Sequence, residues 1–297
     1  MEAANDAAMM AAFEVARPTM FGIAYRMLGT HADAEDVLQD VFIRWSEADR
    51  HSIQNPAAWF TTVCTRRSID VLRSVARART DYVGPWLPEP LAGATMEEPQ
   101  ELSSALETAF LLLLQRASPR ERAAFLLHEV FGLGHVEVGK VLGTSEAASR
   151  KLASRARAHV ASGRQRARLD PDRQRALLTA FQDAIMTDDM AAFSAVLTND
   201  VQLKADGGGK AAAASEPLQG RDAVLAFCER ARAWWRVYRW TIVRLATGYG
   251  TVLHDGSIAV ATIWFDSDDG EGLSKIYIMR NPDKLRSVNV GTERCGA

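Results

Sequence analysis

The chain has 297 residues, a formal net charge of -2, and 47% apolar and 24% charged residues. This length predicts two or three domains, and the composition is that of a globular protein, which excludes disordered and fibrous classes. Cys64, Cys228 and Cys295 have no paired spacing, and no stretch of about 18 apolar residues occurs, so we expect a cytoplasmic protein without disulfides, metal or membrane contact.

Two segments rich in helix-breaking or charged residues divide the chain. Four prolines and two glycines lie within DYVGPWLPEPLAGATMEEPQ, and SGRQRARLDPDR forms the second break. We therefore predict domains over 1–80, 102–163 and 173–297, joined by linkers at 81–101 and 164–172.

The first piece has the three-and-four spacing of apolar residues that predicts helices. We expect Pro18 in the first turn of a helix that ends at Leu28, and a second helix over 31–49 that buries Val37, Val41 and Trp45. Acidic residues crowd the exposed face of that second helix. A third helix follows Asn55, which is suited to the N-cap, and its charged residues are mostly arginines.

The second piece ends in the rhythm of a helix-turn-helix motif. A short helix over 137–142, a turn at Gly143 and a capping residue at Ser145 precede TSEAASRKLASRARAHV. We expect this last helix to bury Ala148, Leu152, Ala156 and Val160 and to expose its cations. Such a helix has the shape and charge to enter the major groove of DNA, although a solvated basic surface gives the same pattern.

The third piece mixes helices and strands. We expect helices over 173–197 and 221–235, and then strands over 240–249, 250–266 and 272–280, with a hairpin turn at His254, Asp255 and Gly256. This order predicts an α+β domain.

Several of these motifs resemble bacterial sigma factors. DAEDVLQDVFIRW and NPAAWFTTVCTRRSIDVLR are similar to sigma region 2, and SPRERAAFLLHEVFG with VGKVLGTSEAASRKLASRAR is similar to region 4. YVGPWLPEP, DGGGK and NPDKL resemble signatures of the SigJ-like group of extracytoplasmic-function (ECF) sigma factors, which carry a C-terminal SnoaL-like extension. The resemblance implies all-α regions 2 and 4 followed by a SnoaL/NTF2-like α+β cone.

The resemblance implies two partners, RNA polymerase core (β′ clamp helices and β subunit) and promoter DNA. It assigns polymerase binding to Asp36, Gln39, Asp40 and Arg44. It assigns the single-stranded minus-10 element to Asn55, Trp59, Thr62, Arg66, Arg67 and Arg73, with the alternative that Trp59 is a core residue. It assigns the minus-35 duplex to Ser149, Arg150, Lys151, Arg155 and Arg157.

The resemblance also implies a regulatory contact between the linker and the C-terminal extension. Its residues are Trp86, Leu87, Pro88, Asp206, Gly207, Gly208, Gly209, Lys210, Asn281, Pro282, Asp283, Lys284 and Leu285. We expect the extension to act as a built-in regulator, because a tethered domain meets its target at a high effective concentration.

Two other functions fit parts of the sequence. A SnoaL-like enzyme or sensor fused to a DNA-binding regulator would use a pocket ligand, and Asp188, Asp206, Tyr249, His254 and Asp266 are its available acids or bases. No catalytic pair is visible among them, so we expect no enzymatic activity and no cofactor. A conventional repressor would bind duplex DNA without polymerase.

Overall fold

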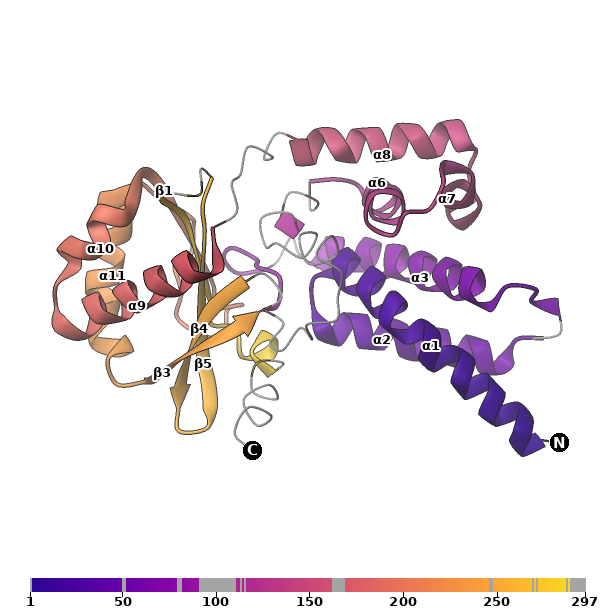
Figure 1. Ribbon diagram of the computed structural model, residues 1–297, viewed down its shortest axis with the longest axis horizontal. Coiled ribbons are helices and arrows are strands. Elements are labelled where there is room, and N and C mark those ends of the chain that lie inside the picture. The colour runs from indigo at the N-terminus through magenta and orange to yellow at the C-terminus, as the bar shows by residue number, and fades with distance from the viewer. Residues whose placement is uncertain are drawn as a thin grey trace. The chain divides into compact units, whose positions relative to one another are not determined.

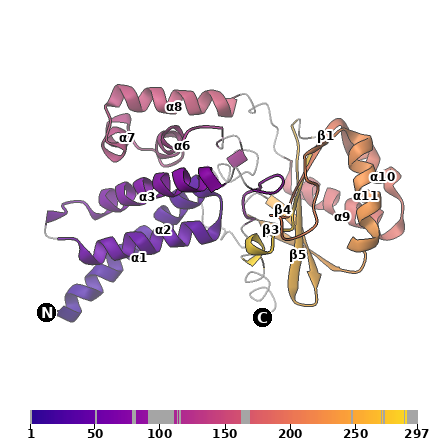
Figure 2. The same cartoon turned by 180° about the vertical axis from the view of Figure 1, so that it is seen from behind.

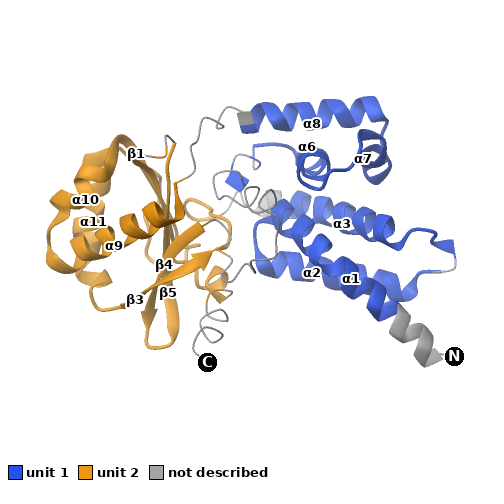
Figure 3. Ribbon diagram, in the orientation of Figure 1, with its two compact units in different colours: residues 1–80, 110–162 blue, residues 81–109, 163–297 orange. Residues whose placement is uncertain are grey.

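The computed structural model describes residues 2–49, 52–78, 82–90, 111–112, 114, 116–161, 169–245, 248–268, 270, 272–286 and 288. These residues form two compact units, residues 1–80 with 110–162 and residues 81–109 with 163–297 (Figure 3). Both helical pieces therefore belong to one unit, and the described part of the first linker belongs with the C-terminal piece. The predicted linker residues 91–101 and 164–168 lie outside the described residues, so the predicted domain boundaries remain predictions.

Three helices build the first part of the helical unit (Figure 1): α1 (Glu2–Leu28), α2 (His31–Glu47) and α3 (Pro56–Ala78). Thr30 caps α2 by accepting a hydrogen bond from the Asp33 amide at 3.2 Å, and Asn55 caps α3 by accepting one from the Ala58 amide at 3.0 Å. The predicted apolar stripe of α2 is confirmed, because Val37, Val41 and Trp45 are buried.

The prediction for Pro18 is wrong, since this residue lies inside α1 instead of in its first turn. An interior proline disfavours a helix because it removes one hydrogen bond and crowds the preceding turn. Packing of the earlier turns offsets this cost. Phe13 is buried, with its ring centroid 5.0 Å from Phe42 and 6.0 Å from Phe60, so the turn before Pro18 is anchored to the core through this side chain.

The second helical group consists of α6 (Pro119–Phe125), the π-helical turn η3 (Leu126–Val130), α7 (His135–Leu142) and α8 (Glu146–Ala161). Gly143 closes α7 in the left-handed conformation, with φ +61°, which glycine adopts at no steric cost. Ser145 caps α8 by accepting a hydrogen bond from the Ala148 amide at 3.2 Å. The predicted helix-turn-helix is therefore confirmed, with α7 beginning two residues earlier than expected.

The buried face of α8 differs from the predicted one. Ser149, Ala153, Ala156 and Val160 are buried, whereas Ala148 and Leu152 are half-buried. A row of residues four apart advances by 40° at each step, so a predicted stripe of fours drifts off the true face. The observed spacing of four, three and four follows the 3.6-residue period more closely.

The second unit is an α+β domain whose helices α9 (Pro171–Thr187), α10 (Met190–Val196) and α11 (Arg221–Trp235) lie on one side of a sheet (Figures 1 and 2). The sheet has the order β2-β1-β6-β5-β4-β3, and β1 and β6 are parallel neighbours. Its strands are β1 (Leu197–Asp206), β2 (Leu218–Gln219), β3 (Arg239–Leu245), β4 (Gly248–Asp255), β5 (Ile258–Asp266) and β6 (Leu273–Met279).

The sequence predicted neither strand β1 nor the short strand β2 of this domain. Val201, Leu203 and Ala205 are buried at alternate positions, while Gln202 and Lys204 are more exposed, which is the period of two typical of a strand. The predicted hairpin is confirmed, because residues 256–257 connect β4 to β5 and Gly256 has φ +58°. The all-helical regions followed by this α+β domain confirm the predicted fold class.

Aromatic and aliphatic side chains between the helices and the sheet form the core of the α+β domain. Phe181 of α9 lies within 4.7 Å of Phe193, 5.7 Å of Trp235 and 5.6 Å of Phe265, measured between ring centroids. After β6, the short helix η4 (Pro282–Lys284) places NPDKL beside the end of β1, where the Arg280 and Asn281 amides both donate to the Asp206 carbonyl. This junction organises the predicted regulatory residues.

Candidate functional site

The acidic face of α2 is exposed as predicted. Asp36, Gln39 and Arg44 are exposed, and none of the three forms an ion pair with a residue that the structure describes. Asp40 differs, because its carboxylate accepts a hydrogen bond from Arg67 Nε at 2.5 Å. One predicted polymerase-binding residue is thus paired with one predicted DNA-binding residue.

The predicted minus-10 residues of α3 are partly engaged in the fold. Asn55 caps the helix, the Thr62 hydroxyl donates to the Ala58 carbonyl at 2.8 Å, and Arg73 lies 3.5 Å from Asp70. All of these groups remain at least partly exposed. They can therefore exchange a local hydrogen bond for one to a phosphate or a base at small cost.

Trp59 belongs to an aromatic cluster at the start of α3. Its ring centroid lies 5.2 Å from Trp45 and 5.4 Å from Phe60, and both partners are buried. Trp59 itself is half-buried. One edge of the ring therefore contributes to the core and the other reaches solvent. This position is compatible both with a core residue and with stacking on a minus-10 base.

Arg66 joins the two helical groups of this unit. Its Nε donates to the Val141 carbonyl at 2.8 Å and its Nη2 donates to the Lys140 carbonyl at 3.2 Å, both at the C-terminal end of α7. Cations are favourable at this end of a helix because its last carbonyls lack partners. The motif resemblance assigned Arg66 to DNA alone, and nothing in the sequence predicts this contact between residues so far apart in the chain.

The exposed face of α8 carries the predicted cations. The Arg150 side chain is 64% exposed and pairs with Glu146 one turn earlier. Lys151 is exposed and forms no ion pair with any residue in the described ranges. Exposed pairs contribute at most about 1 kcal/mol, so both cations are available to another charged molecule.

Ser149 is a correction to the predicted minus-35 set. This residue is fully buried, and its hydroxyl oxygen lies 3.2 Å from Nδ1 of His135 on α7. Burial, followed by the charges of His128 and Arg150, lowers the pKa of His135, so the ring is neutral near pH 7. Ser149 lies on the buried side because α8 is rotated from the predicted stripe, and its hydroxyl contacts α7 instead of solvent.

Arg155 and Arg157 hold α8 against its neighbours. Arg155 Nη1 lies 3.6 Å from Glu121 of α6, and Arg157 pairs with Glu129 of η3. Burial acts to raise the pKa of Glu121, but hydrogen bonds from Ser118 and the charges of Arg155 and His159 outweigh it, and the pKa is lowered. These two arginines therefore have a structural partner as well as an exposed surface.

The predicted regulatory residues converge on the carboxylate of Asp206, which is fully buried at the end of β1. It accepts hydrogen bonds from the Tyr82 hydroxyl at 2.5 Å, from the Leu87 amide at 2.8 Å and from Lys284 Nζ at 2.7 Å. We call residues 82–90 the linker segment. The Asp206 carboxylate thus binds both a backbone amide and a side chain of the linker segment.

Lys284 completes this contact from the other side. Its ammonium group donates to the Leu87 carbonyl at 2.7 Å and lies 4.1 Å from the centroid of the Trp86 ring. The side chain is only 7% exposed. A buried lysine needs such an arrangement, because an ammonium removed from water is stable only when it is paired and hydrogen-bonded.

The glycines of DGGGK make room for the linker segment. A Cβ on Gly208, which has φ +58°, would lie 2.2 Å from Asn281 Nδ2 and 3.1 Å from the Tyr82 hydroxyl oxygen. A Cβ on Gly209, which has φ +71°, would lie 3.3 Å from Val83. Positive φ and close approach both require glycine here. These glycines were among the predicted regulatory residues, but their partners Tyr82 and Val83 were not, although both lie in the motif YVGPWLPEP.

The acids and bases considered for catalysis do not form one cluster. Asp206 is paired with Lys284, Asp188 pairs with Arg232, and His254 is buried on β4. Burial and the charge of Arg239 lower the pKa of His254.

Within the described ranges, no group of three or more His, Cys, Asp or Glu side chains is placed to hold a metal ion. None of the helices in those ranges combines the length and apolar character needed to cross a bilayer.

Comparisons with known proteins agree with the motifs. Sigma-70 region 2 matches residues 12–78, and Sigma-70, region 4 matches residues 107–160. The ECF RNA polymerase sigma factor SigJ of Mycobacterium tuberculosis is 39% identical over 220 residues, which cover 72% of this chain and 70% of that protein. The probable ECF RNA polymerase sigma factor SigI of the same organism is 28% identical over 248 residues, covering 75% and 86%.

A solved structure matches both units. The crystal structure of Mycobacterium tuberculosis extracytoplasmic function sigma factor SigJ superposes with a TM-score of 0.72 at 31% identity. The match covers 94% of this chain and 98% of the other. It therefore extends over the α+β domain, which lies beyond the residues matched by the two sigma-70 regions.

Proposed function

Because the chain belongs to the ECF RNA polymerase sigma factors, we propose that α2 binds core polymerase while α3 and α8 bind promoter DNA. The observation that carries this proposal is the exposed pair Arg150 and Lys151 on the second helix of the helix-turn-helix motif. A helix in this position presents its outer face to the major groove, where cations bind phosphates and can read guanine.

The acidic face of α2 supports the polymerase half of the proposal. Asp36 and Gln39 are exposed on a helix whose other side is buried in the core. Charges of this kind set the register and the rate of association more than the affinity. A complementary basic surface on the polymerase would therefore recruit the protein through this face.

Run-off transcription with core polymerase tests the proposal. We expect the wild-type chain to start RNA synthesis at defined promoters, and we expect Lys151→Ala to lower promoter affinity by about 1 kcal/mol or more through the lost charge. Arg173→Ala, on the exposed surface of α9, is the matched control and should change nothing. A chain that neither joins core polymerase nor starts transcription contradicts the proposal.

We further propose that the contact of the linker segment with Asp206 and Lys284, called the linker contact below, regulates this activity. The linker segment follows α3 and precedes the residues matched by region 4, so the α+β domain binds the chain between its two DNA-binding regions. Releasing that segment changes how freely the two regions can separate. Moving such an equilibrium from mostly closed to mostly open needs about 5.5 kcal/mol of differential binding, which polymerase and promoter together can supply.

Variants of the full-length chain test the regulatory role. Trp86→Ala removes the ring beside Lys284 and should change run-off output relative to wild type, because the segment is bound less tightly. Arg173→Ala, on the exposed surface of α9 and outside the predicted regulatory set, is the control and should leave the output unchanged. Equal output from Trp86→Ala and wild type, with release of the segment verified by proteolysis, contradicts the role.

Members of this family are transcription factors, and we propose that the α+β domain of this chain has kept no catalytic activity. Its candidate acids and bases are separated, and the most buried carboxylate, Asp206, is occupied by Lys284 and the linker segment. General acid–base catalysis needs two groups with different pKa values around one substrate. Assays for proton-transfer reactions should therefore show no turnover above the buffer rate.

A further inference from the structure

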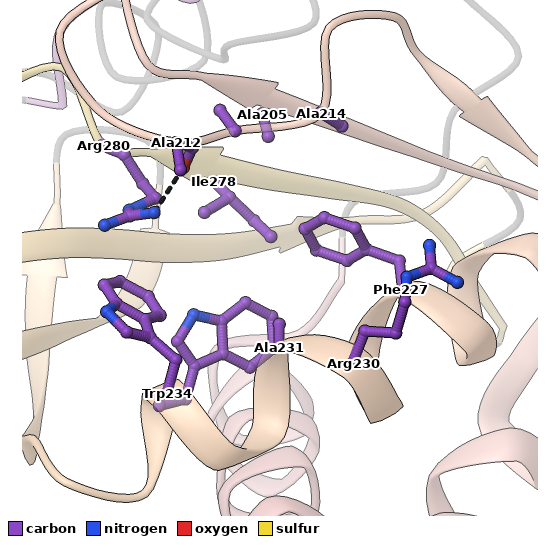
Figure 4. Close-up of a pocket in the computed structure, with 11 residues that line it drawn as sticks. Ala205, Ala212, Ala214, Phe227, Arg230, Ala231, Trp234, Ile278 and Arg280 are labelled. Atoms are coloured by element: carbon purple, nitrogen blue, oxygen red, sulfur yellow. Dashed lines mark hydrogen bonds between the residues drawn. The ribbon is translucent and has the colours of Figure 1, made fainter.

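The α+β domain contains a cavity of about 490 Å³ that the linker contact does not use. It lies between α11, the ends of β1 and β6, and the loop at 211–214, and Figure 4 shows the side chains around it. Its volume is within the range of about 300–1,000 Å³ that proteins use for small organic ligands. All of its described lining residues belong to one unit.

Most of the wall is apolar. Phe227 and Trp234 of α11 face Ile278 of β6 and the loop with Ala212 and Ala214 (Figure 4). Trp235 and Ala213 also line the cavity. Small residues on the loop leave the space open, and the aromatic rings offer flat surfaces on which a ring or an alkyl chain can pack. The occupant should therefore have an apolar body.

The charged lining residues in the described ranges are Arg230 and Arg280. The Arg280 guanidinium carbon lies 3.7 Å from the centroid of the Trp234 ring, and Arg280 Nη1 donates to the Ala212 carbonyl. The Nε atom is buried and has no hydrogen-bond partner among the described residues. Burial lowers the pKa of Arg280 from its ordinary value, although arginine stays protonated in proteins.

This arrangement selects the charge of the occupant. Arg280 forms no ion pair with any carboxylate in the described ranges, so its positive charge at the wall of the apolar cavity is not balanced there, and Arg230 at the exposed rim adds a second positive charge. A guanidinium at the wall of an apolar cavity is stabilised by an anionic acceptor that reaches its remaining N–H groups. A planar carboxylate fits a guanidinium through two parallel hydrogen bonds.

The geometry points to a binding site for a small carboxylate with an aromatic or other apolar body, held by Arg280 and packed against Trp234 and Phe227. The cavity also touches the linker contact through its own wall. Ala205 and Arg280 precede Asp206 and Asn281 directly, and a Cβ on Gly84 of the linker segment would lie 3.8 Å from the Ala214 carbonyl oxygen. Ligand binding and docking of the linker segment therefore share one loop.

Three probes that share a naphthalene ring, are similar in size and differ in charge test this site on the full-length chain. Naphthoate, naphthalenemethanol and naphthylmethylamine are titrated by calorimetry. We expect naphthoate to bind with one molecule per chain and about tenfold more tightly than the neutral alcohol, because a hydrogen bond to a buried charge has that value. The amine should bind most weakly.

Variants locate the probe in the cavity. Arg280→Met retains an unbranched side chain but removes the positive charge, and it should abolish the preference for naphthoate. Arg173→Met on exposed α9 should leave that preference unchanged. Ala231→Phe on α11 fills the cavity and should weaken both the acid and the alcohol. Circular dichroism and the melting temperature without ligand verify that each variant is folded.

Several results would overturn the inference. These are equal affinity for the acid and the alcohol, an unchanged preference in Arg280→Met, unaltered naphthoate binding in Ala231→Phe, and no binding of any probe at millimolar concentration. Should Arg280→Met fail to fold, Arg230→Met at the exposed rim provides the second variant and must reduce the naphthoate preference. None of these readouts involves transcription, so they are independent of the proposed promoter function.

Discussion

The cations of α8 and the lysine of the linker contact lie in opposite environments. Arg150 is 64% exposed and pairs with Glu146 on its own helix, and Lys151 is exposed beside it. Lys284 is 7% exposed and contacts a fully buried carboxylate, a backbone carbonyl and two aromatic rings. Arg150 and Lys151 are therefore available to another molecule, whereas these contacts of the Lys284 ammonium group are all inside the protein.

The difference separates charges for binding from charges for folding. An exposed ion pair contributes about 0–1 kcal/mol, so breaking it to bind a phosphate costs little. Removing one partner of a buried pair leaves an uncompensated charge and costs several times more. Sequence alone shows the same residue types in both places, and only burial distinguishes them.

The largest effect is expected at the buried pair. Lys284→Met should lower the free energy of unfolding of the α+β domain by about 3–5 kcal/mol, because the Asp206 carboxylate stays buried without its counter-charge. Urea unfolding followed by circular dichroism measures the change.

The double variant Asp206→Leu with Lys284→Met is the control for this explanation. It removes both charges together and should recover part of the loss, since no uncompensated charge remains, although the Leu87 amide and the Tyr82 hydroxyl lose their acceptor. Lys210→Met, at an exposed pair with Asp283, should cost less than about 1 kcal/mol. A loss at Lys210→Met as large as that at Lys284→Met would remove the distinction between the two environments.

The next effect isolates the close packing around Gly208, where Asn281 and then Tyr82 approach the backbone. Gly208→Ala and Gly256→Ala replace glycines with the same φ of +58°, but a Cβ meets Asn281 at 2.2 Å in the first and nothing within 4 Å in the second. We expect about 1–2 kcal/mol of destabilisation at Gly256 from the backbone alone. Gly208→Ala should cost about 1–3 kcal/mol more through steric overlap. Equal losses in the two unfolding curves would contradict a tight contact.

Local patterns predicted the helical elements well because each depends on neighbouring residues. The stripe of Val37, Val41 and Trp45 defines α2, and Asn55 and Gly143 mark helix ends by their capping preferences. The motif resemblance then assigned functions to exposed faces. It also selected Asp206 and Lys284, which the structure joins although neither position has a partner that its own sequence neighbourhood reveals.

What the sequence could not show depends on tertiary packing. The rotation of α8 that buries Ser149 is set by α7, and the Arg66 hydrogen bonds depend on where α7 ends relative to α3. Pro18 was misplaced because the packing of Phe13 overrides a local helix-breaking preference. The role of Arg280 was not predicted for a similar reason. In the sequence, an arginine after an apolar strand indicates only the end of the strand, and the cavity beside it exists only in the folded domain.

A third pair of variants tests the corrected face of α8. Arg150→Ala should weaken promoter binding by about 1–3 kcal/mol if the guanidinium contacts a base, with little change in stability. Ser149→Ala should leave promoter affinity unchanged and lower stability by about 1 kcal/mol, because its hydroxyl bonds His135 inside the protein. Footprint titration of the holoenzyme and thermal unfolding measure the two properties. A promoter defect in Ser149→Ala without a stability loss would restore the original assignment.

The smallest effect concerns pH and the ion pairs that hold α8. The folded pKa of Glu121 is below its ordinary value of 4.5, so the carboxylate stabilises the folded state at any pH above 4.5, and this contribution is lost as the pH falls through the lowered folded pKa. Glu121 also accepts a hydrogen bond from the Ser118 amide at 2.9 Å in a capping box. Glu121→Gln keeps an oxygen for that hydrogen bond but cannot titrate. We therefore expect Glu121→Gln to flatten the fall in the free energy of unfolding below pH 4.5 while costing about 1 kcal/mol or less at neutral pH. Urea unfolding at a series of pH values measures this. If the free energy of unfolding falls equally steeply below pH 4.5 in both proteins, Arg155 and the Ser118 cap do not bind the Glu121 carboxylate more strongly than solvent does.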